Sequence, residues 1–121
     1  MLAALSDDEL LALYPGEALQ TLTPRSIRTR TELLAELKQV RRRGWGTNFG
    51  ESEPDVSGVA VGVASRAGEV PYAIAVSAPR ARLAQSRVKV IVDELRKTAD
   101  LVATAGSATY SDCGRTLPAD L

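Results

Sequence analysis

The first apolar stretch of the chain is short and follows polar residues that suit the amino terminus of a helix. Ser6 and Glu9 have the spacing of a capping box, in which each side chain accepts a hydrogen bond from the other residue's backbone. Leucines follow, and Pro15 with Gly16 then stops any helix, because proline cannot continue the ladder and glycine readily leaves it. The pattern predicts a short helix that ends at about Tyr14.

A second helical pattern begins at Thr29. Thr29 and Glu32 form another possible capping box, and Gly44 provides a left-handed cap at the far end. The cations at Arg41–Arg43 complement the dipole of the last turn, and we interpret them as a solvated cap rather than a nucleic-acid patch. Between these ends, one stripe holds Leu33, Leu37 and Val40. The sequence therefore predicts a helix that ends at Gly44.

From Trp45 onward the apolar period changes from that of a helix to that of a strand. A short strand is expected at 45–49, followed by a polar loop at 50–55. Longer strands at 56–65 and 70–78 flank a four-residue connection, Arg66–Glu69, that contains glycine. This arrangement predicts an antiparallel hairpin that ends at Pro79.

The two faces of this hairpin differ in side-chain size. One face carries large residues, namely Val59, Val61, Val63, Val70, Tyr72, Ile74 and Val76. The other face carries small ones, namely Gly58, Ala60, Gly62, Ala64, Ala73, Ala75 and Ser77. A face of small residues admits either a closely packed helix or a ligand lying against the sheet. Side-chain size alone favours the helix.

A long amphipathic helix is expected after the hairpin, from about Arg82 to Ala105, with Gly106 as its cap. It would cover one face of the sheet, and the residues at helical spacing are Leu83, Val88, Ile91, Val92, Leu95, Ala99 and Val102. The following residues, 107–121, are polar and lack a period, so we expect a loose or disordered tail. The predicted domain therefore spans residues 1–106.

Composition indicates one ordinary globular domain. The chain has 121 residues, 45% of them apolar, and its 15 basic and 15 acidic residues cancel. A domain that grips nucleic acid is usually basic overall, so this chain alone is a poor DNA binder. The longest apolar stretch is far shorter than the ~20 residues of a spanning helix, and no secretory signal precedes it. We therefore expect no membrane contact and a cytoplasmic location.

Candidate chemistry is sparse. The chain contains no histidine, and its one cysteine, Cys113, lies in the predicted tail. The acidic residues Glu51, Glu53 and Asp55 share a loop without a partner base, and no phosphate-binding glycine motif is present. An enzyme is therefore the weakest interpretation, and we expect no catalytic residue, no metal site and no cofactor.

The order of these elements resembles the carboxyl-terminal domain of IclR-type transcriptional regulators. The residues that carry the resemblance are the segment Thr23–Ile27, the run Leu33–Leu37 followed by Val40–Trp45, the acidic loop, and Val76–Pro79 at the end of the hairpin. The similarity covers about residues 2–106. Two positions depart from the family pattern, since Ser52 replaces a glutamate and Ala78 replaces a glycine.

The resemblance implies a GAF-like α+β fold, in which helices flank an antiparallel sheet. It also implies an effector pocket between the sheet and its covering loops. The corresponding ligand-binding residues here are Asn48, Gly58, Ala75 and Ser77. Three of them lie on the face of small residues. The resemblance therefore adds support to the interpretation that this face binds a ligand. A hydroxyl at Ser77 and an amide at Asn48 suit a carboxylic acid.

The function implied is that of an effector sensor. A small organic or aromatic acid would bind and allosterically control an attached winged-helix DNA-binding domain, which this chain lacks. The family domain normally begins earlier, so the domain is expected to be truncated at its amino terminus. Exposed sheet edges and the resemblance both favour a homodimer or homotetramer. The alternative is a dimerisation module without a ligand, in which the long helix fills the small face.

Overall fold

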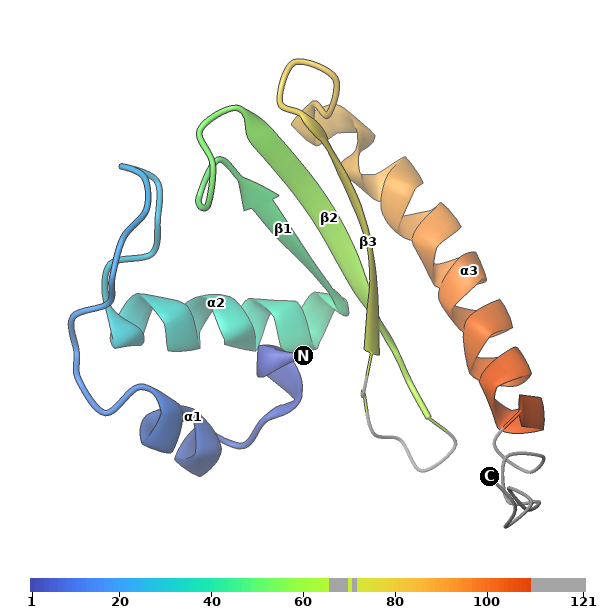
Figure 1. Cartoon of the computed structure of the whole chain (residues 1–121), viewed down its shortest axis with the longest axis horizontal. Helices are drawn as coiled ribbons and strands as arrows, with labels where there is room; N and C mark the ends of the chain where they lie inside the picture. Colours follow the sequence, from blue (N-terminus) through green and yellow to red (C-terminus); the bar gives the residue numbers. More distant parts are fainter. Residues whose placement is uncertain (66–69, 71, 110–121) are drawn as a thin grey trace, which may run out of the picture.

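The computed structural model describes residues 1–65, 70 and 72–109, with only the backbone described for 106–109. A three-stranded antiparallel sheet of order β1-β2-β3 has α3 on one side, and α1 and α2 on the other (Figure 1). In chain order the elements are η1 (Leu2–Ala4), α1 (Asp7–Leu13), α2 (Arg30–Arg43), β1 (Trp45–Phe49), β2 (Val56–Val63), β3 (Tyr72–Pro79), η2 (Gln85–Arg87) and α3 (Val88–Thr109). The predicted α+β class and antiparallel sheet are confirmed.

Both predicted capping boxes are present. At α1, the Glu9 backbone N–H donates to Ser6 Oγ at 3.3 Å, and the Ser6 N–H donates to Glu9 Oε2 at 2.7 Å. At α2, the Glu32 N–H donates to Thr29 Oγ1 at 3.1 Å, and the Thr29 N–H donates back to Glu32 at 3.2 Å. Gly44 ends α2 with φ 77°, the left-handed conformation expected of it. Local sequence therefore sets both of these helices.

The hydrophobic core lies between α3 and the face of large residues. Val59 and Val61 of β2 are only 1% and 2% exposed, and they pack against the apolar stripe of α3. That stripe consists of Val88, Val92, Leu95 and Ala99, joined by Leu83 from the preceding loop. Burial of these side chains supplies the main apolar stabilisation of the fold.

The long helix is displaced from its predicted bounds. Leu83 is buried, but it follows a turn in which the N–H groups of Arg82 and Leu83 donate to the Pro79 carbonyl, and α3 begins only at Val88. The predicted start at Arg82 is therefore wrong, because an apolar residue in a turn can match the helical spacing. The helix also continues to Thr109 rather than stopping at Gly106, since a glycine within a helix costs only about 1 kcal/mol.

The hairpin ends also differ slightly from expectation. The paired strands are Val56–Val63 and Tyr72–Pro79, both inset from the predicted turn, and Pro79 lies within β3. The predicted connection Arg66–Glu69, Cys113 and residues 110–121 of the predicted tail lie outside the described residues. Across the described helices, no segment combines the length and the apolar character that crossing a membrane requires.

Candidate functional site

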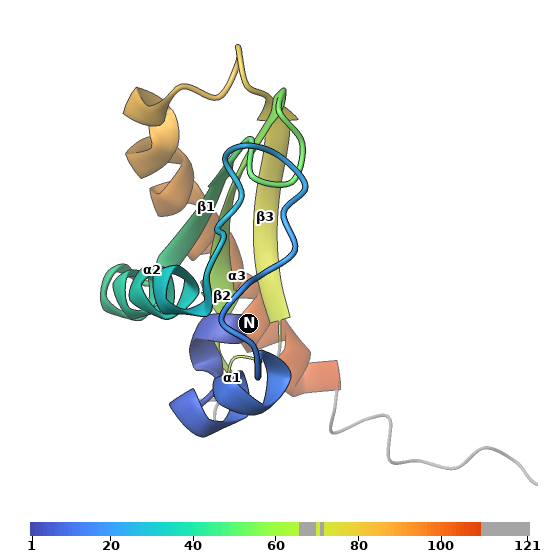
Figure 2. The same ribbon diagram turned by 90° about the vertical axis from the view of Figure 1, so that its left-hand side faces the viewer.

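The face of small residues points away from α3. On β3, Ala73, Ala75 and Ser77 are exposed, whereas the valines on the opposite face of β2 are buried under the helix. Figure 2 views the molecule from the side on which α1, α2 and the segment between them lie. The expectation that the long helix fills the small face is therefore wrong, because α3 buries more apolar surface against the large valines.

Strand register brings three of the four predicted ligand-binding residues into one row. Asn48 of β1 pairs with Gly58 of β2, and Gly58 pairs with Ser77 of β3. Ala75 lies two residues along β3 from Ser77, in the next row of the same face, and pairs with Ala60. Since residues directly opposite each other in a sheet share a face, all four lie on the small face.

The missing side chain at position 58 leaves room beside Ser77. A β-carbon on Gly58 would lie 3.4 Å from Ser77 Oγ and 3.5 Å from the Val76 carbonyl oxygen, so a larger residue there would crowd the hydroxyl. Among the described residues, the Ser77 hydroxyl has no hydrogen-bond partner. It is exposed and can either donate or accept a hydrogen bond.

The Asn48 side chain is less available to a ligand than the Ser77 hydroxyl, because it already makes two hydrogen bonds within the chain. Its Nδ2 donates to Ser52 Oγ at 2.8 Å, and its Oδ1 accepts from the Glu51 N–H at 2.9 Å. The amide therefore orders the loop that follows β1. One N–H and one lone pair remain for a ligand, because an asparagine amide has two donors and two acceptor positions.

A clamp from the segment before α2 holds this loop, and its role was not predicted from the sequence. Thr23 Oγ1 donates to the Gly50 carbonyl and Ser26 Oγ donates to the Glu51 carbonyl, both at 2.6 Å. Ser26 Oγ also accepts from the Thr23 N–H, so the segment forms its own turn. The spacing of Thr23, Pro24 and Ser26 is a turn signal. The residue pattern does not indicate which carbonyls these hydroxyls contact, because the partners lie more than twenty residues away.

Gly50 is required where the clamp meets the loop. Its φ of +82° lies in the left-handed region, and a β-carbon there would lie 2.9 Å from the Pro54 carbonyl oxygen.

In the same loop, burial raises the pKa of Glu51 above its ordinary value, and the nearby charge of Glu36 raises it further. A hydrogen bond with the Phe49 backbone opposes both effects. Among the described residues, no group of three potential metal ligands exists.

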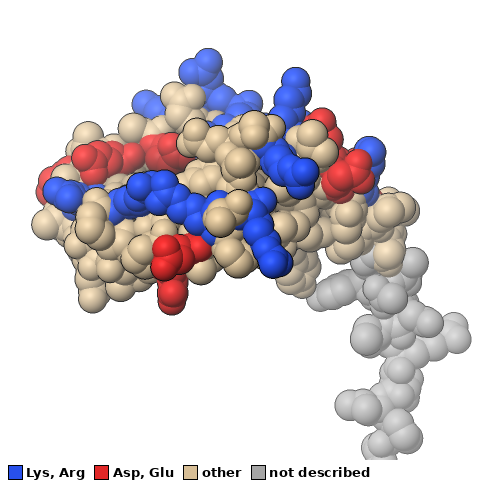
Figure 3. Space-filling view, turned by 90° about the horizontal axis from the view of Figure 1, so that it is seen from above, with Lys and Arg blue, Asp and Glu red and all other residues tan. Residues whose placement is uncertain are grey.

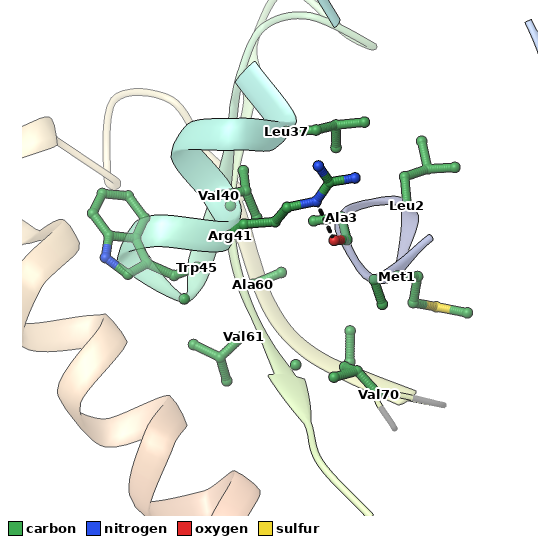
Figure 4. A pocket seen from close by; sticks show the side chains of 15 residues that line it. Met1, Leu2, Ala3, Leu37, Val40, Arg41, Trp45, Ala60, Val61 and Val70 are labelled. Carbon is green, nitrogen blue, oxygen red and sulfur yellow. Dashed lines mark hydrogen bonds between the residues drawn. The ribbon is translucent and has the colours of Figure 1, made fainter. Parts of the chain in front are cut away.

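An apolar cavity of about 510 Å³ opens at the other end of the small face (Figure 4). Its floor is made of Gly46, Ala60, Gly62 and Ala73, and its walls come from η1 and the carboxyl end of α2, including Leu2, Leu37 and Val40. None of the four predicted residues lines it. The cavity adjoins them, because Ala60 is paired with Ala75 and follows Gly58 by two residues.

Two residues at this cavity differ from their predicted roles. Arg41 is not a purely solvated cap, since its guanidinium donates to the Ala3 carbonyl at 2.8 Å, the Leu5 carbonyl at 2.7 Å and Asp7 Oδ1 at 3.0 Å. Val70 was assigned to the large face. Instead it lies against Gly62 on the small face, where a β-carbon on the glycine would clash with it. The reason is that Val70 precedes the paired part of β3.

Comparison with known proteins identifies the family of the chain. The family model described as "Bacterial transcriptional regulator IclR C-terminal" matches residues 1–104. The chain belongs to the IclR family. In sequence, this IclR domain is 33% identical over 94 residues to the DNA-binding transcriptional repressor YiaJ of Escherichia coli K12. The match covers 78% of the chain and 33% of YiaJ.

Solved IclR structures confirm the fold. The Agobacterium tumefaciens repressor BlcR superposes with a TM-score of 0.78 at 26% identity, covering 85% of this chain and 42% of BlcR. The inducer-binding domain of PobR from Acinetobacter, a double mutant in complex with 3-hydroxybenzoic acid, superposes with a TM-score of 0.79. The match covers 84% of this chain and 59% of the PobR chain. At 23% identity it shows a shared fold alone.

The IclR assignment settles the class of protein. The chain spans about a third of the length of YiaJ, and the relatives named here as repressors are regulators rather than enzymes. The expectation of a non-catalytic regulatory domain is therefore confirmed. The ligand-binding role of the four residues stays a prediction.

Proposed function

We propose that this chain is the effector-sensing domain of a transcriptional regulator and that its small face binds a small carboxylic acid. The observation that carries the proposal is the row of Asn48, Gly58 and Ser77 across all three strands, on the face that α3 leaves open. Ala75 extends the same floor by one row. These are the positions that the family resemblance marks for ligand contact.

The chemistry of the face suits an acid with an apolar body. Ser77 Oγ–H and the remaining Asn48 N–H would donate to the carboxylate, and charge-assisted hydrogen bonds of this kind are stronger than neutral ones. The glycine and alanine floor lets a flat ligand approach the backbone closely. The adjoining apolar cavity would accept the rest of an aliphatic or aromatic acid.

Regulation would pass through a separate winged-helix domain that contacts DNA. The chain has no net charge, and Figure 3 shows Lys and Arg on the same face as Asp and Glu. Neither feature favours tight DNA binding by this domain itself. An effector would act by binding one arrangement of the cytoplasmic regulator more tightly than another. As homodimers or homotetramers, such regulators would present paired DNA-binding domains.

A dimerisation module that binds no ligand is the rival function. As expected from the sequence, this alternative requires the long helix to fill the small face. In the structure, α3 lies on the opposite face instead. The open row and the apolar cavity favour the sensor.

Calorimetric titration of the chain separates the two functions. The panel comprises 3-hydroxybenzoate, benzoate and straight-chain monocarboxylates and dicarboxylates. We expect at least one acid to bind, and Ser77→Val to raise its Kd by about tenfold or more, as loss of a hydrogen bond to a charged group does. Ser86→Val, a change of an exposed serine in η2, is the matched control and should leave the Kd within about twofold. Absence of heat from every acid, or equal losses in both variants, would refute the sensor.

A further inference from the structure

Arg25 bears a cationic group that pairs with no acidic side chain in the part of the chain that the structure describes. Its guanidinium makes no hydrogen bond there either, whereas Arg30, Arg41 and Arg43 each pair with a carboxylate. The side chain is exposed. Its planar set of N–H donors is therefore available to a ligand.

Two hydroxyls fix the backbone on either side of Arg25. Thr23 Oγ1 donates to the Gly50 carbonyl at 2.6 Å and accepts from the Arg25 N–H at 3.1 Å. Ser26 Oγ donates to the Glu51 carbonyl at 2.6 Å. Because its neighbours make these bonds, Arg25 is held against the loop after β1 without using its own side chain.

The aliphatic stem of Arg25 lies against the same loop. A β-carbon on Gly50 would lie 3.3 Å from Arg25 Cδ, so the absence of a side chain at position 50 leaves room for the stem. Gly50 follows Asn48 by two residues, which is about 7 Å along an extended chain. The Asn48 amide also extends into this loop, where its Oδ1 accepts from the Glu51 N–H. An acid held by the Asn48 amide would therefore lie within reach of the guanidinium.

The sheet itself has no charge to offer an acid. No paired position of the three described strands carries a charged side chain. Figures 1 and 2 show the segment between α1 and α2 on the side of the sheet away from α3, which is the side of the small face. Arg25 belongs to that segment, and it can supply the positive charge that the strands lack.

The acidic residue of the adjoining loop does not use this charge. Burial raises the pKa of Glu51, the charge of Glu36 raises it further, and a hydrogen bond with the Phe49 backbone lowers it. None of these effects comes from Arg25. Within the described residues the arginine has no counterion, and an ionised acid would provide one.

We propose that Arg25 is a specificity-determining residue of the effector site, a role that rests on the proposed function, and that its guanidinium pairs with the carboxylate of the bound acid. The Ser77 hydroxyl and the Asn48 amide are neutral donors, so they can also bind the carbonyl of an amide. A guanidinium favours the ionised group, because its charge attracts the carboxylate and its fork matches the two oxygens. Arg25 therefore selects acids over their neutral analogues.

Calorimetric titration with acids and their amides tests this selection. The probes are benzoate, 3-hydroxybenzoate and butanoate, each beside its primary amide. We expect Arg25→Gln to raise the Kd of a binding acid by about tenfold or more and to leave the Kd of its amide within about twofold, since only the acid loses a charged partner. Because Arg25 is exposed, the variant should fold, which circular dichroism verifies.

Arg28→Gln is the matched control. It makes the same change of charge three residues along the same segment, where the guanidinium already donates to the Pro24 carbonyl at 3.3 Å. Both Kd values should stay within about twofold of the wild type. If acids bind the wild type and Arg25→Gln equally well, or if both variants lose the same preference for the acid, Arg25 has no such role and the proposed function stands. Failure of every acid to bind the wild type would overturn both.

Discussion

Val59, Val61 and Val63 are almost fully buried on one face of β2, while Gly58, Ala60 and Gly62 on the other face meet a row of exposed small residues on β3. Both sets come from one alternating strand. The valines hold α3 and carry the apolar stabilisation, whereas the small residues leave space for a ligand. The residues that stabilise the fold and those of the proposed binding site therefore alternate along the same strand.

The largest effect on this contrast should come from the α3 stripe. Leu95→Ala removes a side chain that is 6% exposed against the large face, and should lower the free energy of unfolding by about 2–5 kcal/mol through lost burial and a cavity. Urea denaturation measures it. Leu101→Ala changes a leucine of the same helix that is 71% exposed, and should cost no more than about 0.5 kcal/mol. Equal losses would remove the distinction between the two sides of α3.

A small effect on stability is expected from filling the small face. Ala75→Val adds methyl groups to an exposed position, so the free energy of unfolding should change by no more than about 0.5 kcal/mol. Acid binding should nevertheless weaken by about tenfold, since the floor of the proposed site would be raised. The control Ala81→Val lies at an exposed turn position and should preserve both quantities. If Ala75→Val binds acids as the wild type does, Ala75 does not belong to the site.

Local signals in the sequence predicted much of the fold. Ser6 with Glu9, and Thr29 with Glu32, identified two helix starts because a capping box is complete within four residues. Gly44 identified an end for the same reason. Strand alternation identified two unlike faces, because side chains alternate strictly in a strand.

What the sequence did not reveal depends on contacts between distant segments. Thr23 donates a hydrogen bond to a carbonyl 27 residues away, and the Asn48 amide makes two hydrogen bonds with the loop that follows β1. The choice of face by α3 also could not be read locally, since either face admits a helix. Its start was misplaced because Leu83 fits the helical period while lying in a turn.

For the candidate site, family resemblance named the four residues, and strand register explains why they lie together. The alternation of side chains along the strands was enough to put Gly58, Ala75 and Ser77 on one face. It could not show that Asn48 lies in the same row as Gly58 and Ser77, because that depends on the register between strands. The apolar cavity was not predicted, because its walls come from η1 and α2 and its floor from the sheet.

Methyl-selective NMR during titration with the acid panel tests the separation of the two faces most directly. The alanine methyls of the small face at positions 60, 73 and 75 report on one side of the sheet, and the methyls of Val59, Val61 and Val63 report on the other. We predict that a binding acid shifts the alanine signals and leaves those valine signals nearly unchanged. Larger shifts at the valines, or no shift at any of these methyls with any acid, would contradict the account.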